Sequence, residues 1–244
     1  TDSRGGLIMA LTYRALALLL SYPTADVQAA APAIMDTIRS EGMVPAPIVG
    51  ALEKLVRKLE REDLFDLQEG FVHLFDRTRS LSLNLYEHIH GESRDRGQAM
   101  AALVELYRSY GLELTAAELP DHLPVFLDFL STLPEEEAAS LLGEGAHVLA
   151  ALTERLHKRE SPYRAVFGAL TAMTGAVPDS DAVAALMQEP DDNPDDLEAL
   201  DKAWEETAVT FGPSDAGCPK ADSMLSAMNA APPPDKSRRA GAAA

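Results

Sequence analysis

Apolar residues recur at three- and four-residue spacing along most of the chain, with charged residues between them. In the clearest stretch six aliphatic side chains fall on one helical face: Ile48, Val49, Leu52, Leu55, Val56 and Leu59. This spacing follows the 3.6-residue period of an amphipathic α-helix. No segment shows the strict alternation of a half-buried strand. The pattern therefore predicts an all-α fold, a single multi-helix bundle with short connections.

Cap and stop signals divide the first half of the pattern into helices. Pro23 ends an apolar first helix over residues 7–20, and Thr24 or Asp26 is placed to cap a second helix that runs to about Ser40. The amphipathic stretch over residues 48–59 forms the third helix. A shorter helix is expected over residues 64–75, with its aromatic residues on the buried side.

The next helices are expected from similar signals. Ser93 is a candidate N-cap for a helix that Gly111 ends. Asp121 is expected to begin another helix and to cap it through the backbone N–H of Leu123. Pro134 and three glutamates open a helix that runs through residue 156, with its acids at the positive end of the helix dipole. Ser161 and Pro162 then mark the start of a last helix.

The composition changes near residue 178. Nine acids and one base occupy residues 189–206, and beyond Phe211 the chain is rich in Pro, Ala and Ser. Such a segment cannot bury enough apolar surface to offset its ordering entropy. We expect a helical domain over residues 9–178, a partly docked acidic segment over residues 179–212 and a disordered tail over residues 213–244. Residues 1–8 are expected to be an upstream extension or an expression remnant.

Trp204 stands out within the acidic segment, because it is the only tryptophan of the chain. Together with Phe211 it has two alternative roles. It docks back on the helical bundle, or it provides a second contact for a partner protein.

The formal net charge of −18 restricts the possible partners. Nucleic-acid binding is driven by Lys and Arg side chains that neutralise phosphates, so this chain is expected to bind no nucleic acid. An anionic membrane surface is disfavoured for the same reason. The apolar run over residues 7–20 is shorter than the roughly 20 residues that a spanning helix needs, so no direct membrane insertion is expected. A basic partner would be attracted.

The sequence contains little that indicates chemistry. Cys218 is the only cysteine, which excludes an internal disulfide and a cysteine-based metal cluster and fits a reducing compartment. His88 and His90 point to different sides of a helix, and no metal-binding or nucleotide-binding motif accompanies them. Asp121 and His122 are the best candidates for acid–base work, as in a small hydrolase. Adjacent helical residues point about 100° apart, however, so this pair cannot hydrogen-bond in the usual orienting way and we expect no catalytic residues. The lack of a metal-binding motif likewise predicts no metal site.

The stretch after residue 70 favours polypeptide binding instead. Apolar anchors ringed by charges are typical of a groove that takes an amphipathic peptide helix. The alternative is that the apolar residues belong to the core and the charges form a solvated rim. The candidate peptide-binding residues are Phe71, Phe75, Leu83, Tyr86, Glu87, Glu92 and Arg94.

Two phrases of the sequence, SLSLNLYEHIHGESRDRGQAM and ELPDHLP, resemble signature segments of the NarJ family. This family belongs to the wider NarJ/TorD group of redox-enzyme maturation chaperones, and the resemblance extends over about residues 9–212. Phe71 and Phe75 match an aromatic-x-x-Leu-Phe segment of the family. Its Glu-x-Pro-Asp-His signature is complete here, in Glu118, Pro120, Asp121 and His122.

The resemblance implies a helical bundle and a non-enzymatic, cytoplasmic chaperone without a cofactor of its own. Its partner would be the apo catalytic (alpha) subunit of respiratory nitrate reductase, bound through that subunit's N-terminal peptide. The chaperone would hold this subunit for insertion of molybdenum cofactor and an iron–sulfur cluster before membrane docking. The alternatives are a TorD-type chaperone for another molybdoenzyme and the small hydrolase that would use Asp121 and His122.

Overall fold

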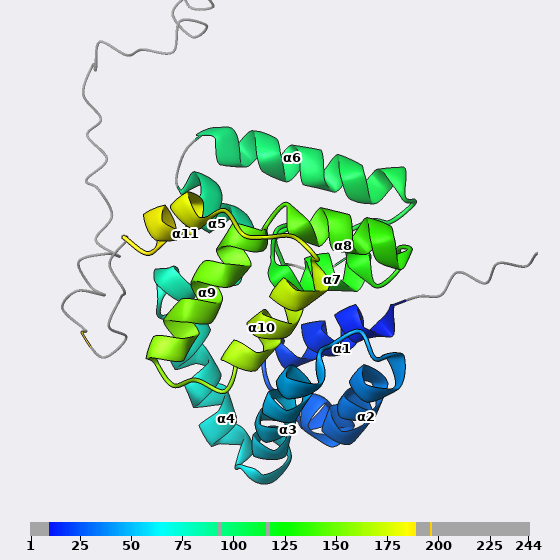
Figure 1. The fold of residues 1–244 in the computed structure, drawn as a ribbon, viewed down its shortest axis with the longest axis vertical. Helices are drawn as coiled ribbons and strands as arrows, with labels where there is room; N and C mark the ends of the chain where they lie inside the picture. Colours follow the sequence, from blue (N-terminus) through cyan, green and yellow to red (C-terminus); the bar gives the residue numbers. More distant parts are fainter. Residues whose placement is uncertain (1–9, 92–93, 116–117, 189–195, 197–244) are drawn as a thin grey trace, which may run out of the picture. The chain divides into compact units, whose positions relative to one another are not determined.

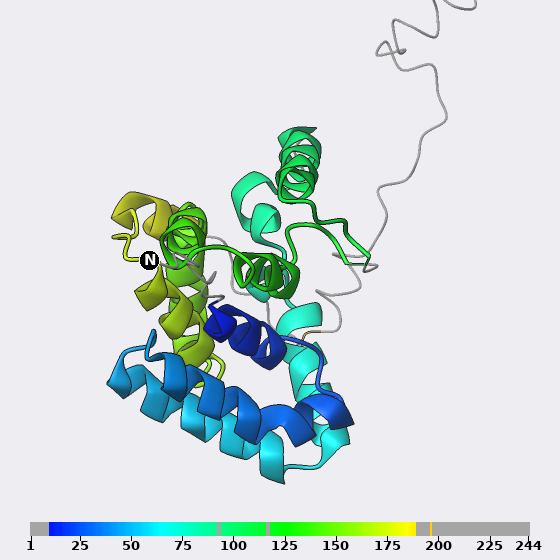
Figure 2. The same ribbon diagram turned by 90° about the vertical axis from the view of Figure 1, so that its right-hand side faces the viewer.

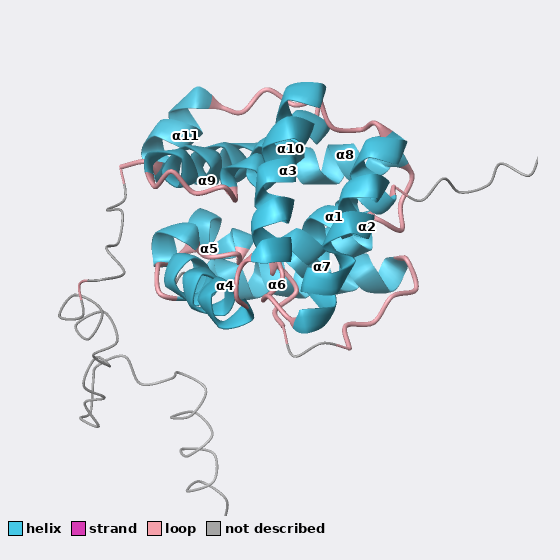
Figure 3. Ribbon diagram, turned by 90° about the horizontal axis from the view of Figure 1, so that it is seen from below, coloured by secondary structure: helices cyan, strands magenta, loops and turns pink. Residues whose placement is uncertain are grey.

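In this computed structural model of the protein, residues 10–91, 94–115, 118–188 and 196 are described. The chain divides into two units, residues 1–200 and residues 201–244, and every described residue lies in the first. The described residues form helices joined by short loops, with no β-strand among them (Figure 3). One isolated antiparallel bridge joins Asn84 to His122. The predicted all-α fold is confirmed.

The helices follow one another closely along the chain (Figure 1). Two short irregular turns, the π-helix η1 and the 3₁₀-helix η2, interrupt the α-helices. In chain order the elements are α1 Leu11–Leu19, α2 Ala25–Glu41, α3 Ala46–Arg61, α4 Leu64–Phe71, η1 Val72–Asp76, η2 Arg79–Leu81, α5 Leu85–His90, α6 Arg94–Ser109, α7 Leu123–Leu130, α8 Glu135–Gly143, α9 Ala146–Lys158, α10 Arg164–Met173 and α11 Ser180–Leu186.

The short helix α1 lies at the centre of the packing. It contacts both α2 and α7, while α3 bridges α2 to α10, and α10 packs along α9. Figure 2 shows α2 and α3 running side by side beneath α1. Tyr13, Leu16 and Leu20 of the α1 segment have no exposed surface. Each fully buried large apolar side chain stabilises the fold by roughly 1.5–3 kcal/mol, so this central segment anchors the bundle.

A carboxylate from a different helix caps α1. Glu41, the last residue of α2, accepts hydrogen bonds from the backbone N–H groups of Leu11 (2.9 Å) and Thr12 (2.7 Å) and from the Thr12 hydroxyl (2.6 Å). The first N–H groups of a helix have no partner within the helix, and a negative charge there also favours the helix dipole. Glu41 thereby ties the end of α2 to the start of the central helix.

Several predicted boundaries in the first half agree with the structure. Thr24 caps α2 by accepting a hydrogen bond from Val27 N–H at 3.2 Å. Gly42 and Gly111 have positive φ angles of 67° and 74°, which glycine adopts at little cost after a helix. The first helix begins at Leu11 and ends at Leu19, and residues 7–9 of its predicted range lie outside the described residues. The predicted cap Ser93 lies outside the described residues.

Two predictions of single helices were wrong. The helix expected over residues 64–75 ends as α4 at Phe71 and continues as one π-helical turn, in which Arg77 N–H bonds to Val72 O at 3.0 Å. The helix expected over residues 134–156 is two helices, α8 and α9. The break falls at Glu144 and Gly145, where the N–H groups bond three residues back and glycine has low helix propensity.

The last predicted helix also differs. Ser161 and Pro162 form a turn, in which the Arg164 N–H bonds to the Ser161 carbonyl at 3.2 Å, and α10 begins only at Arg164. A further helix, α11, follows beyond residue 178. Asp179 caps it, because its Oδ1 accepts hydrogen bonds from Asp181 N–H (2.9 Å) and Ala182 N–H (3.2 Å). The acidic segment therefore begins with a helix that packs against α9.

We predict that Glu41→Ala lowers the free energy of unfolding by about 1–2 kcal/mol, because α1 loses the acceptor for its first N–H groups. Urea denaturation followed by circular dichroism measures this. Glu60→Ala, which removes an exposed carboxylate from α3, is the control and should change stability by less than about 0.5 kcal/mol. Equal effects of the two substitutions would contradict the capping role.

Candidate functional site

The two sequence phrases meet in space, although about 35 residues separate them. The backbone N–H of Leu123 donates to the carbonyl of Leu83 at 2.8 Å, and the N–H of Leu85 donates to the carbonyl of Asp121 at 3.1 Å. These two bonds flank the isolated antiparallel bridge. The phrases therefore form one structural unit, which we call the signature junction: residues 82–90 and 118–123.

Asp121 lies at the centre of the signature junction and has no exposed surface. Its Oδ2 accepts a hydrogen bond from the N–H of Tyr86 at 3.0 Å, in the first turn of α5. The expectation that Asp121 caps its own helix was wrong, because the N–H of Leu123 is already bonded to Leu83. Asp121 is instead a cap supplied to α5 from a distant part of the chain.

Burial dominates the electrostatics of this junction. It raises the pKa of Asp121, while the hydrogen bond from Tyr86 N–H and the positive charge of Arg96 lower it in part. The Oδ1 atom of Asp121 is buried and makes no hydrogen bond within the described residues. Burying a carboxylate with one oxygen that lacks a partner among the described residues is costly in its charged form. The hydrogen bond from Tyr86 N–H, which holds α5 in position, offsets part of this cost.

His122 has a similar environment. Its Nδ1 atom is buried and without a hydrogen-bond partner in the described part of the chain. Burial lowers the pKa of the imidazole, and the negative charges of Glu118, Asp121 and Asp76 oppose this shift. Burial likewise raises the pKa of Asp76, the last residue of the π-helical turn. Burial therefore favours the neutral form of His122, while three nearby carboxyl groups favour its charged form.

A second set of bonds ties the turn before α5 to the helix. The hydroxyl of Ser82 donates to Glu87 Oε2 at 2.7 Å, and the Ser82 carbonyl lies 2.8 Å from His88 Nε2. Arg79 Nε lies 3.4 Å from Glu87 Oε1 in a partly exposed ion pair. These contacts connect the residues just before α5 to its middle, so the turn and the helix form one rigid element.

Three predicted peptide-binding residues belong to the core. Phe71 and Phe75 are only 5% and 4% exposed, and their rings lie 4.9 Å apart within a cluster that includes Tyr163, 5.1 Å from Phe75. Leu83 is 6% exposed. These three side chains are buried in the core and do not line an open groove in the structure, so their part in peptide binding stays a prediction.

Tyr86 on α5 is the accessible apolar residue of the predicted site, and two residues outside that prediction, Ile89 and Leu119, are accessible as well. Tyr86 is half-buried, its ring 5.6 Å from that of His90, while Ile89 and Leu119 are 43% and 46% exposed. Burial, together with the negative charges of Asp121 and Glu144, raises the pKa of Tyr86. These accessible apolar side chains lie on α5 and before α7, and the acidic residues Glu87 and Glu118 are neighbours of Tyr86 and Leu119 in the sequence.

The remaining predicted residues have less defined places. Glu118 is exposed, and the carbonyl of Pro120 accepts a hydrogen bond from the Tyr107 hydroxyl at 2.6 Å, which fixes the turn to α6. Arg94 is the first residue of α6. Glu92 lies outside the described residues.

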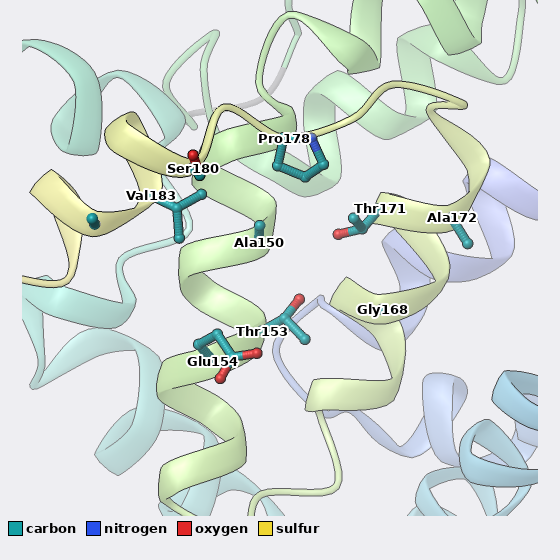
Figure 4. Close-up of a pocket in the computed structure, with 10 residues that line it drawn as sticks. Ala150, Thr153, Glu154, Gly168, Thr171, Ala172, Pro178, Ser180 and Val183 are labelled. Carbon is teal, nitrogen blue, oxygen red and sulfur yellow. The ribbon is translucent and has the colours of Figure 1, made fainter.

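A separate groove lies between α9, α10 and α11 (Figure 4). It has a volume of about 630 Å³ and small, mostly apolar lining residues, among them Ala150, Gly168 and Ala184. The hydroxyls of Thr153 and Thr171 bond to carbonyls of their own helices and so do not add polarity. Phe71, Phe75, Leu83, Tyr86 and Glu87 do not line this groove.

The described residues contain no group of histidine, cysteine or acidic side chains that could hold a metal ion. The hydrolase alternative also has no support, because Asp121 bonds to backbone and the His122 Nδ1 atom has no carboxylate partner. In the described ranges no helix is long and apolar enough to cross a membrane.

Comparison with known proteins identifies the family. Residues 43–169 match the family described as nitrate reductase delta subunit. The chain is 42% identical over 211 residues to the nitrate reductase molybdenum cofactor assembly chaperone NarJ of Escherichia coli (strain K12), covering 86% of this chain and 87% of that protein. It is 38% identical to the probable assembly chaperone NarW of the same strain (81% and 82% covered) and 30% identical to a probable NarJ of Bacillus subtilis (66% and 87% covered).

The chain therefore belongs to the nitrate reductase delta subunit family, the NarJ family that its two phrases predicted. Members similar to it are assembly chaperones, so the prediction of a chaperone and not an enzyme is confirmed.

Sequence reasoning missed two organising residues, Glu41 and Arg155. Arg155 is 2% exposed on α9 and donates to two distant carbonyls. An arginine three residues after Leu152 and next to Leu156, within an apolar stripe, was a usable signal for a buried cation. Glu41 gave no such signal, because its partners precede it by about 30 residues.

We predict that Asp121→Ala lowers the free energy of unfolding by about 1 kcal/mol through loss of the α5 cap. Asp121→Asn keeps an oxygen that can accept from Tyr86 N–H, so it should retain most of that stability. Urea denaturation of both variants measures the difference. An Ala variant as stable as the Asn variant would contradict the capping role.

His122 predicts a pH dependence. Because burial lowers its folded-state pKa below the ordinary 6.5, its neutral form stabilises the fold, and that contribution is lost as pH falls from about 6.5 through the folded pKa. His122→Gln cannot be protonated, so its stability relative to the unmodified protein should rise as pH is lowered from about 7.5 to about 5. A stability difference that stays constant over this pH range, measured by thermal unfolding, would refute the assignment.

Proposed function

We propose that this protein is the assembly chaperone of a respiratory nitrate reductase. It binds the N-terminal peptide of the apo catalytic (alpha) subunit and holds that subunit while molybdenum cofactor and an iron–sulfur cluster are inserted, before the enzyme docks at the membrane. Similarity to NarJ and NarW over more than four fifths of the chain supports this client. A TorD-type chaperone for another molybdoenzyme is the second candidate.

The signature junction is the observation that carries the proposal. It brings the two family phrases together and leaves Tyr86, Ile89 and Leu119 accessible, with Glu87 next to Tyr86 and Glu118 next to Leu119 in the sequence. Apolar side chains of this kind suit one face of a peptide helix, whose burial supplies most of the affinity. Leu83 belongs to the buried part of the junction, and Phe71 and Phe75 lie in the core.

The charge of the chain fits a basic client segment. The formal net charge is −18, and acidic side chains flank the accessible part of the junction. Long-range attraction mainly accelerates association and is screened over about 8 Å at physiological salt. The chaperone needs no cofactor for this role, because the inserted groups belong to the client. We expect it to act in the cytoplasm, where an apo-enzyme is loaded before membrane docking.

We predict that Tyr86→Ala weakens binding of the client's N-terminal peptide by about tenfold, since loss of roughly 1.4 kcal/mol of apolar contact corresponds to that factor. Isothermal titration calorimetry with the full chain measures it. Tyr110→Ala is the control: it removes an accessible tyrosine directly after α6 and should leave the affinity unchanged.

Salt separates the two contributions to binding. Raising the ionic strength should slow association while leaving the dissociation rate and the effect of Tyr86→Ala nearly unchanged. A folded protein that binds no client peptide at either salt concentration would refute the proposed function. Preference for the N-terminal peptide of a different molybdoenzyme would favour the TorD-type alternative.

A further inference from the structure

Arg155 forms hydrogen bonds to two segments that lie far apart in the sequence. Its Nη1 donates to the carbonyl of Ser80 at 2.6 Å, and its Nη2 donates to the carbonyl of Leu186 at 2.6 Å. Ser80 lies in η2, directly before the signature junction, and Leu186 is the last residue of α11. A single guanidinium on α9 therefore holds the turn before α5 and the end of α11 together.

The chemistry of this group makes the connection stiff. A guanidinium is planar and always charged, and its donors form a rigid fork with a fixed geometry. Arg155 is 2% exposed, so the loss of the Leu186 carbonyl would remove a hydrogen bond from a buried cation. The side chain is consequently expected to shift when α11 leaves, and the Ser80 carbonyl shifts with it.

By contrast, α11 itself is held weakly. It has only seven residues, none of them buried, and isolated helices of this length are not stable in water. It follows a loop in which Gly175 has a φ of 61° and Val177 is 93% exposed. One side of α11 borders the open groove, where Val183 projects toward α9 (Figure 4). Docking on α9, including the bond from Arg155, is what keeps this helix formed.

We propose that Arg155 is a positioning residue that couples the docking of α11 to the conformation of residues 79–88. When α11 is docked, Arg155 fixes the Ser80 carbonyl, and the bonds among Ser82, Glu87 and His88 transmit that position to α5. When α11 detaches, the turn before α5 loosens. Loosening of this turn is expected to speed release of the client peptide. That expectation rests on the proposed function, whereas the coupling between α11 and residues 79–88 does not.

Hydrogen exchange of the full chain without a client tests the coupling. Asp179→Ala removes the α11 cap and should speed amide exchange in residues 180–188 by roughly fivefold. The coupling predicts faster exchange in residues 79–88 as well, although Asp179 bonds only within α11. Asp179→Asn retains the cap oxygen and should restore both segments. Val183→Asp, which places a charge against α9, loosens α11 by a second route.

The double substitution Arg155→Met with Asp179→Ala completes the test, because without the guanidinium the cap substitution should no longer affect residues 79–88. Faster exchange confined to α11 in Asp179→Ala and Val183→Asp would overturn the proposal, even if Arg155→Met does not fold. Peptide titration then separates the two claims. Faster release of the client peptide from Asp179→Ala supports the expected effect of α11 on client release. Absence of peptide binding by the unmodified chain contradicts the proposed function but not the coupling.

Discussion

The buried carboxylate of Asp121 determines how the accessible surface of this protein is built. It sits at the start of α5, accepts the N–H of Tyr86 and is held there by the backbone pairing of Leu83 and Leu85 with Leu123 and with Asp121 itself. A six-residue helix such as α5 is too short to be stable by itself, so its position depends on this cap and this pairing. The cost is a carboxylate with one buried oxygen unsatisfied.

This arrangement explains why an aromatic segment and a charged segment lie together in the sequence. Phe71 and Phe75 fill the core against Tyr163, and the π-helical turn that contains Phe75 leads the chain out toward η2 and α5. π-helical turns are rare and often occur near functional sites. Here the turn leads directly from the buried aromatic pair to η2, the element that precedes the signature junction in the chain.

The helices could be predicted from the sequence because the apolar residues of each helix recur at helical spacing on the face that is buried. Thr24 and Gly42 also marked their boundaries correctly, since caps act through neighbouring residues. The same local logic failed for Asp121, whose partner is 35 residues away, and for Glu41, which caps a helix about 30 residues earlier. Local rules assign a capping side chain to the nearest helix, whereas these two carboxylates satisfy distant ones.

The candidate site shows the same division. Sequence pattern marked Phe71, Phe75 and Leu83 together with Tyr86 as one group, but hydrophobicity alone does not tell which members face the core and which face solvent. Only the packing separates the buried aromatic pair from the accessible Tyr86. Arg155 was missed because charged residues are almost never fully buried unless they are paired. It donates to backbone carbonyls of distant segments, which the sequence pattern does not reveal.

The central claim is that the signature junction forms the surface that receives the client. Hydrogen exchange of the full chain, with and without a saturating amount of the N-terminal peptide of the nitrate reductase catalytic subunit, tests this most directly. The account predicts slower exchange in residues 82–90 and 118–123 on peptide binding, with little change in the walls of the groove between α9 and α10. Protection confined to α9, α10 and α11, with residues 82–90 and 118–123 unchanged, would contradict it.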